Sequence, residues 1–190
     1  ETMRALSDLK SQGKIRAIGV SNFSRAQIEE AARFGRIDTL QPPYSLFWRQ
    51  AEKDTLPYCT ANGMTVLAYS PMAQGILAGR FGARPAFAEG DHRKGHRLFQ
   101  ADIYPRVQAA LERLRPIAGR NGVSLGQLAL GWVIHHSGVC AIAGARNAVQ
   151  AAENAAAAAL ALPADDLAEM DAIGRTVTDG LDDNPVQWNF

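Results

Sequence analysis

The chain has 190 residues, of which 47% are hydrophobic, and a formal net charge of +1. This composition is typical of one globular domain or a large part of one, and the near-neutral charge argues against a nucleic-acid partner. We expect no membrane span and no secretory signal, because no apolar run is long enough. Cys59 and Cys140 lie in apolar settings, which predicts buried thiols, a reducing compartment and a cytoplasmic protein.

The first half of the sequence alternates helical and strand patterns. Met3, Leu6 and Leu9 recur at helical spacing, and Gly13 follows them as a stop signal. The short apolar run 14–20 precedes Ser21, and the runs 38–46 and 64–69 follow it in the chain. The expected elements are helix 2–12, strand 14–20, helix 24–34, strand 38–46, helix 49–61 and strand 64–69.

The second half begins with residues 79–101, which are rich in glycine, proline and charge and are expected to form a long loop. Two interpretations of this loop stay open: a cover over a bound ligand, or a mobile surface segment. The elements expected after it are helix 103–121, helix 124–135, strand 139–143, a helix from 147, helix 164–175 and a tail over 179–190. Ser24 with Gln27, and Ser124 with Gln127, have the spacing of capping boxes, and Asn147 precedes Gln150 in the same way.

Strand and helix therefore alternate four times, and no hairpin turn signal separates the strands. This alternation predicts a parallel α/β sheet covered by helices, with strands buried on both faces. Both a doubly wound sheet and a β/α barrel of the TIM type have this alternation of strands and helices. A complete barrel has eight strand–helix units in about 250 residues, so a barrel would be present here only as a half of about four units.

Polar residues gather where the expected strands end. In a parallel α/β fold these positions share one edge of the sheet, where ligands bind. The set offers amide, hydroxyl and aromatic groups without a carboxylate, which suits an uncharged amide ring and phosphates better than a metal. Its members are Ser21, Asn22, Gln41, Tyr69, Ser70, Gly144, Ala145, Arg146 and Asn147.

Arg146 stands just before the helix that begins near Asn147. The free N–H groups of a helix start attract anions, and an adjacent arginine can form a forked hydrogen bond to a phosphate. An ordinary capped helix with a surface arginine is the alternative interpretation.

Four segments together resemble the second half of an aldo-keto reductase, in that family's order and with its spacing. The resemblance covers nearly the whole chain and implies a TIM-type barrel that binds a nicotinamide nucleotide. The segments are GKIRAIGVSNF, QPPYSLF, YSPMAQGILAGRF and IAGARNAVQAAEN.

The resemblance also implies a role for each matching residue. Ser21, Asn22 and Gln41 match the residues around the nicotinamide carboxamide, and Tyr69 matches the aromatic residue stacked on its ring. The loop around the pyrophosphate is matched by Ser70, Met72, Gln74 and Gly75. The segment around the adenosine 2′-phosphate and the adenine is matched by Gly144, Ala145, Arg146, Gln150, Glu153 and Asn154.

The expected cofactor is NADP, with NAD as the alternative. Some family members carry a lysine at the position of Gly144, so Arg146 is expected to be the only nearby cation. Any preference for the 2′-phosphate of NADP would then depend mainly on Arg146.

The resemblance implies a catalytic aspartate, tyrosine, lysine and histidine, which belong to the first half of the family's barrel. No residue here matches them, so we expect no catalytic residue in this chain and a native protein that extends upstream of Glu1. Tyr44 lies near Gln41 and could face the same edge, but no lysine follows it at a useful spacing. No metal site is expected at His92 and His96.

Residues 1–190 are thus expected to be one partial aldo-keto reductase barrel, truncated at its N-terminus. Its expected activity is NADPH-dependent reduction of aldehydes and ketones, with this chain as the cofactor-binding half and inactive alone. The alternatives are a non-catalytic nucleotide-binding module and an inactive fragment. Expected partners are a small carbonyl substrate and, through exposed half-barrel edges, a second copy of the chain.

Overall fold

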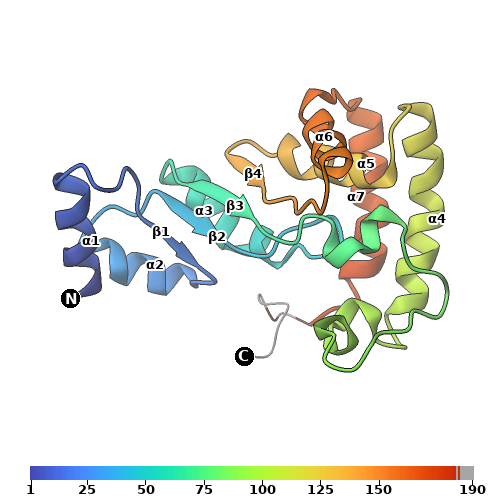
Figure 1. Ribbon diagram of the computed structural model, residues 1–190, viewed down its shortest axis with the longest axis horizontal. Coiled ribbons are helices and arrows are strands. Elements are labelled where there is room, and N and C mark those ends of the chain that lie inside the picture. Colours follow the sequence, from blue (N-terminus) through green and yellow to red (C-terminus); the bar gives the residue numbers. More distant parts are fainter. Residues whose placement is uncertain (183, 185–190) are drawn as a thin grey trace.

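The computed structural model describes residues 1–182 and 184, and its centre is a parallel four-stranded sheet (Figure 1). The strands pair in chain order, β1-β2-β3-β4, so the predicted parallel sheet is confirmed. Val20, Leu40, Val66 and Val139 are register neighbours across the sheet. The strands are β1 (Gly19–Ser21), β2 (Thr39–Gln41), β3 (Thr65–Ala68) and β4 (Val139–Ala141).

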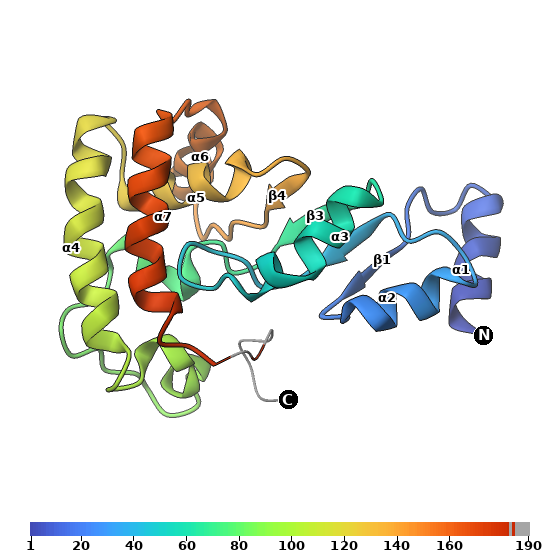
Figure 2. The same ribbon diagram turned by 180° about the vertical axis from the view of Figure 1, so that it is seen from behind.

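Helices follow the strands as the alternation predicts. They are α1 (Thr2–Ser11), α2 (Arg25–Ala32), α3 (Thr55–Ala61), α4 (Tyr104–Arg120), α5 (Leu125–His135), α6 (Ala148–Ala156) and α7 (Ala164–Thr178). Helices α2 and α3 cover one face of the sheet, in front of it in Figure 2, while α4 and α7 pack side by side at the far end. Within the described residues, none of these helices combines the length and the hydropathy needed to cross a lipid bilayer.

Only one face of the sheet is covered by the described residues. Leu40, Val66 and Val139 are buried on the helix side. On the other side Leu67 is half-buried and its register neighbour Cys140 is exposed. The prediction of strands buried on both faces, with a buried Cys140, is therefore wrong for this structure, whereas Cys59 is buried as expected.

Capping chemistry sets the helix starts where the sequence predicted it. Ser24 Oγ accepts from the backbone N–H of Gln27, and the backbone N–H of Ser24 donates in return to Gln27 Oε1. Ser124 and Gln127 form the same pair of bonds. Asn147 also caps α6, but the Gln150 side chain accepts from the backbone N–H of Arg146 instead. The bond between Arg146 and Gln150 therefore holds the loop before α6, while Asn147 caps the helix itself.

The region after β2 departs most from the sequence prediction. The expected strand 38–46 pairs regularly only over β2, because two consecutive prolines at 42–43 provide no N–H groups. The expected helix 49–61 is two pieces, a 3₁₀ turn (Gln50–Lys53) and α3. They are interrupted at Asp54, whose φ and ψ of −148° and −57° are not helical.

A buried polar network ties this region to α5 and α7. The Arg49 guanidinium is 8% exposed and donates to both carboxylate oxygens of Glu52, at 2.8 and 2.9 Å, and to Asp171 Oδ1 at 2.8 Å. Trp132 Nε1 donates to the same Asp171 oxygen, and its ring lies 4.8 Å below the guanidinium. Tyr44 is fully buried and donates to Glu52, so the idea that it faces the ligand edge is wrong.

Candidate functional site

The ends of β1, β2 and β3 bring four of the predicted residues into one cluster. Ser21 Oγ and the backbone N–H of Asn22 both donate to the Gln41 carbonyl oxygen, at 2.9 and 3.1 Å. Tyr69 Oη donates to Asn22 Oδ1 at 3.1 Å. Burial raises the pKa of the Tyr69 phenol, so it is a neutral hydrogen-bond donor at neutral pH. These contacts hold the Tyr69 hydroxyl against the Asn22 side chain and tie Ser21 and Asn22 to the end of β2.

Strained backbone marks the same sheet edge. Asn22, Ser70, Ala73 and Gln74 have φ values of 57°, 53°, 47° and 58°, and they are the non-glycine residues with positive φ in the described part of the chain. Such conformations cost about 1–3 kcal/mol each and persist where the surroundings over-determine them, most often at ligand sites. Their concentration at the ends of β1 and β3 distinguishes this edge from the rest of the fold.

A groove of about 560 Å³ opens beyond this cluster, between the loop after β3 and the start of α6. Its walls are held by side-chain bonds to neighbouring loops: Gln74 Nε2 donates to Ser70 Oγ at 2.7 Å, and Asn154 Nδ2 donates to the Gly144 carbonyl at 3.1 Å. The predicted residues that line it are Ser70, Met72, Gln74, Gly75, Gly144, Ala145, Arg146, Gln150, Glu153 and Asn154.

Several residues of the groove were not identified from the sequence. Arg80, Phe81 and Arg93 come from the segment after β3, and Ser124 and Gln127 come from the start of α5. The expectation that Arg146 is the only nearby cation is therefore wrong, because three arginines line one groove. Arg80 lies within the recognised YSPMAQGILAGRF motif and could have been identified, whereas Arg93 reaches the groove only through tertiary folding.

The charge of the groove favours an anion. Its lining carries Arg80, Arg93 and Arg146 against one carboxylate, that of Glu153. The guanidinium groups of Arg80 and Arg146, both exposed, have no ion-pair partner within the described residues. The N-terminal end of α6, beside Arg146, adds the partial positive charge of a helix start.

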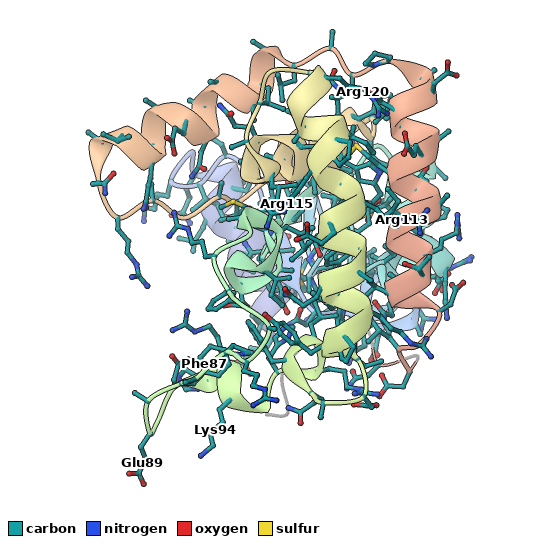
Figure 3. All side chains as sticks on the ribbon, turned by 90° about the vertical axis from the view of Figure 1, so that its right-hand side faces the viewer. Phe87, Glu89, Lys94, Arg113, Arg115 and Arg120 are labelled. Carbon is teal, nitrogen blue, oxygen red and sulfur yellow. The ribbon has the colours of Figure 1, made fainter. Side chains whose placement is uncertain are left out.

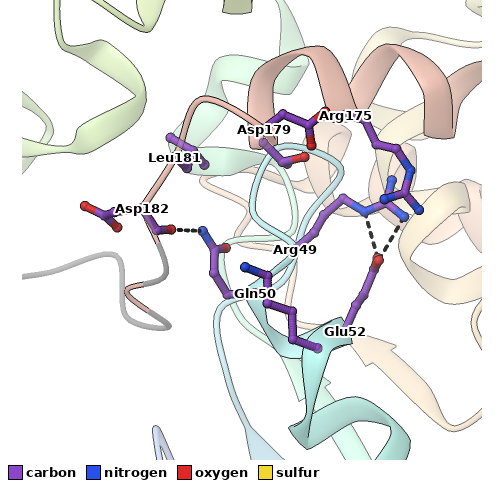
Figure 4. A pocket seen from close by; sticks show the side chains of 9 residues that line it. Arg49, Gln50, Glu52, Arg175, Asp179, Leu181 and Asp182 are labelled. Carbon is purple, nitrogen blue, oxygen red and sulfur yellow. Dashed lines mark hydrogen bonds and ion pairs between the residues drawn. The ribbon is translucent and has the colours of Figure 1, made fainter.

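A second cavity, of about 510 Å³, lies between the 3₁₀ turn after β2 and the C-terminal end of α7 (Figure 4). Arg49 and Glu52 at its wall are paired with each other, and Gln50 donates to the carbonyl of Asp182 at 3.1 Å. It contains none of the predicted site residues and carries charges of both signs. Its chemistry therefore indicates no particular ligand.

Two of the histidines, His96 and His136, make structural contacts. His96 is buried, and its Nδ1 accepts from the backbone N–H of Leu98. His136 is the C-cap residue of α5, and its Nδ1 lies 3.0 Å from the Trp132 carbonyl oxygen. Among the described residues, no group of three or more His, Cys, Asp or Glu side chains is placed to hold a metal ion.

Residues 1–175 match the model of the aldo/keto reductase family, and the chain belongs to this family. It is 37% identical over 158 residues to the NADH-specific methylglyoxal reductase of Escherichia coli (strain K12), covering 83% of this chain and 48% of that protein. Aldo-keto reductase YhdN of Bacillus subtilis (strain 168) is 36% identical over 148 residues, covering 77% and 45%. The chain thus spans about half the length of the relatives it matches.

Solved structures also resemble this chain over about half of their own length. The glycerol dehydrogenase AKR11B4 from Gluconobacter oxydans superposes with a TM-score of 0.88 at 33% identity, over 96% of this chain and 56% of that one. An aldo/keto reductase from Klebsiella pneumoniae in complex with NADP and acetate gives 0.67 at 30% identity, over 98% and 56%. The parallel sheet described here is accordingly part of an aldo-keto reductase barrel.

Proposed function

We propose that the protein is an NADPH-dependent oxidoreductase that reduces aldehydes or ketones to alcohols, and that residues 1–190 are its nucleotide-binding part. One observation carries this proposal: the polar cluster at the ends of β1 to β3 and the arginine-lined groove lie along one edge of the sheet. An extended dinucleotide, with an amide ring at one end and phosphates beyond it, matches that succession of groups.

The cluster fits the nicotinamide end. Tyr69 provides a half-buried aromatic face, and Ser21, Asn22 and Gln41 provide the hydroxyl and amide groups that pair with a carboxamide. Tyr69 donates to Asn22 Oδ1, which leaves the Asn22 amide nitrogen available as a donor. When bound, the nicotinamide would supply the hydride for the reduction, and these side chains would orient its ring.

The groove fits the phosphates and the adenosine. Ser70, Met72, Gln74 and Gly75 line the groove from the loop after β3, in which Ser70, Gln74 and Gly75 have positive φ. On the opposite wall the argument for NADP over NAD depends on Arg146, since its guanidinium can pair with a 2′-phosphate. Gly144, Ala145, Gln150, Glu153 and Asn154 complete this wall around the adenosine.

The proton donor for the carbonyl is not assigned to any residue here, since no residue matches the family's catalytic aspartate, tyrosine, lysine and histidine. We propose that these 190 residues alone do not catalyse the reduction. A non-catalytic nucleotide-binding module or an inactive fragment is the alternative function for the same site. We further propose a small carbonyl substrate and a cytoplasmic location, which the free thiols Cys59 and Cys140 support.

The test is nucleotide binding to the purified full-length protein, followed by turnover of small aldehydes and ketones. Tyr69→Ala should weaken NADPH and NADH about equally, because it removes the face that both nicotinamides share. Arg146→Ala should weaken NADPH about tenfold, as for the loss of one charge-assisted hydrogen bond. It should leave NADH within about twofold.

Arg113→Ala is the matched control, because Arg113 is an exposed arginine of α4 outside the groove (Figure 3). Its affinities should equal those of the wild type. Absence of nucleotide binding by the wild type would reject the proposal. Binding without turnover of any carbonyl compound would favour the non-catalytic module.

A further inference from the structure

The Gln127 side chain joins α5 and α6, two helices that pack side by side (Figure 1). Gln127 stands in the first turn of α5, where its Oε1 atom accepts from the backbone N–H of Ser124 in the capping box. Its Nε2 atom donates to the backbone carbonyl of Glu153 on α6, at 3.1 Å. One side chain therefore caps α5 with its acceptor and holds α6 with its donor.

The two helices are anchored very differently. Six residues of α5 are buried, and one of them, Trp132, belongs to the buried network of Arg49. Within the described part of the chain, none of the residues of α6 is buried. Because packing against neighbouring elements supplies most of the stability of a helix in a protein, α6 depends more than α5 on its polar contacts.

Side-chain bonds make α6 and the loop before it one unit. The backbone N–H of Arg146 donates to Gln150 Oε1 at 2.9 Å, and Asn154 Nδ2 donates to the Gly144 carbonyl at 3.1 Å. The backbone N–H of Gln150 donates to Asn147 Oδ1 at 2.9 Å. A displacement of α6 would therefore move Arg146 with it.

The Glu153 carbonyl is a suitable attachment point because it lies in the last turn of α6. Carbonyl groups in the last turn of a helix lack donors from a following turn. The backbone N–H groups at the C-terminal cap of α6 donate to the carbonyls of Asn154 and Ala155. Gln127 supplies a donor for the carbonyl of Glu153, so the same bond satisfies a helix end and fixes α6 against α5.

We propose that Gln127 is a positioning residue for Arg146, and thereby a second determinant of any preference for NADPH over NADH. The inference rests on the proposed function, in which Arg146 pairs with the 2′-phosphate. The Gln127 bond fixes α6 against α5, and α6 fixes the loop that carries Arg146. A forked hydrogen bond to a phosphate depends on the direction of the guanidinium, so a displaced loop weakens the nucleotide that has the 2′-phosphate.

Two other roles would also account for a glutamine at this position. Gln127 could serve only to cap α5, or it could contact the nucleotide directly, because it lines the groove. The capping box of α2 supplies a control for the first role. Gln27 makes the same bonds with Ser24, is exposed and does not line the groove. Its Nε2 atom has no hydrogen-bond partner among the described residues.

The experiment measures the affinities of NADPH and NADH for the full-length protein and for Gln127→Met, Gln127→Glu and Gln27→Met. Methionine is similar in length to glutamine but has no N–H donor. Gln127→Met should weaken NADPH about fivefold, as for the loss of one hydrogen bond, and leave NADH within about twofold. Gln27→Met should bind both nucleotides as the wild type does.

Gln127→Glu separates the two ends of the side chain, because a glutamate accepts from Ser124 but cannot donate to Glu153. Its melting temperature should equal or exceed that of the wild type, since glutamate suits the first turn of a capped helix. Its NADPH affinity should nevertheless fall by at least about fivefold. The neutral Gln127→Met variant shows how much of that fall is due to the lost donor rather than to the added negative charge.

A double-mutant cycle with Arg146→Ala tests whether Gln127 acts through Arg146. In the Arg146→Ala background, Gln127→Met should change the NADPH affinity by less than about twofold. A loss of about fivefold in that background, or an equal loss for NADH, would indicate a direct contact with the nucleotide and overturn the proposal. An equal loss of NADPH affinity in Gln27→Met would indicate a capping role alone and would also overturn it.

Circular dichroism and melting curves of each variant check that its fold is retained. If the wild type binds both nucleotides and Gln127→Met leaves both affinities unchanged, the role of Gln127 is rejected while the proposed function stands. Equal affinities of the wild type for NADPH and NADH would reject Arg146 as a determinant, and Gln127 with it. If the wild type binds neither nucleotide, the proposed function itself fails.

Discussion

Arg49 illustrates how one buried charge joins distant parts of this chain. Its guanidinium contacts Glu52 three residues away and Asp171 on α7, 122 residues away, and it stacks on Trp132 of α5. Burial of an arginine is costly unless its donors are satisfied. Here three residues, Glu52, Asp171 and Trp132, supply acceptors or an aromatic face, so each member depends on the others.

We therefore expect Arg49→Ala to lower the free energy of unfolding by about 1.5–3 kcal/mol, the range for charge-assisted hydrogen bonds, because the guanidinium is buried while the Glu52 and Asp171 carboxylates are 25% and 41% exposed. Arg115→Ala is the control, because Arg115 pairs with Glu112 on the surface of α4 with both side chains more than half exposed. It should cost less than about 0.5 kcal/mol. Urea denaturation measures both, and equal losses in the two variants would contradict the argument.

Residues of the site differ in how well the sequence could predict them. Tyr69, Asn22 and Gln41 were predictable, because parallel strands place their carboxyl ends at one edge. Their cluster forms as that geometry requires. Arg93 was not predictable, because it reaches the groove from a segment whose packing no local pattern encodes. The exposure of Cys140 was also missed, since an apolar strand does not reveal which face is covered.

Among the elements, α7 packs unusually close to the loop after β2. A Cβ at Gly174 would lie 2.7 Å from the Leu46 carbonyl oxygen and 2.9 Å from its Cδ1 atom. Only a residue without a side chain permits this approach. The glycine thus sets the distance between α7 and the loop that carries Tyr44 and Arg49.

Gly174→Ala should reduce stability by about 1–3 kcal/mol, because the added methyl group overpacks a rigid backbone contact. Gly119→Ala is the matched control within α4, where a Cβ would meet nothing within 4 Å. There the higher helix propensity of alanine should stabilise the protein by up to about 1 kcal/mol. Thermal melts of the two variants should shift in opposite directions, and a shift of both upward would rule out the close contact.

Helix starts were the most predictable elements, since Ser24 and Ser124 encode their capping bonds within four residues. Element lengths were less predictable. The interruption at Asp54 and the short β2 arise from tertiary contacts and from prolines that weaken pairing without abolishing it. The alternation of strands and helices still identified the architecture, because it depends on pattern rather than on boundaries.

At the scale of the whole molecule, the sheet that the described residues form has two open edges. Within the described residues, β1 and β4 each pair on one side only, and one face of the sheet is uncovered. Unpaired strands of this kind associate with other chains. A chain of these 190 residues alone should therefore self-associate. Light scattering coupled to size-exclusion chromatography over a range of concentrations would test this, and a monomer with a cooperative melt throughout would refute it.

The pairing order of the sheet also bears on how the protein is made. Because β1, β2 and β3 pair in chain order across short connections, each strand leaves the ribosome after the neighbour it needs. In contrast, β3 can pair with β4 only after the 79–101 segment, α4 and α5 have been synthesised. The side of the groove that carries Arg146 is therefore synthesised after the side that carries Ser70 and Gln74. Until then a nascent chain has the cluster of Ser21, Asn22, Gln41 and Tyr69 but not the complete arginine-lined groove.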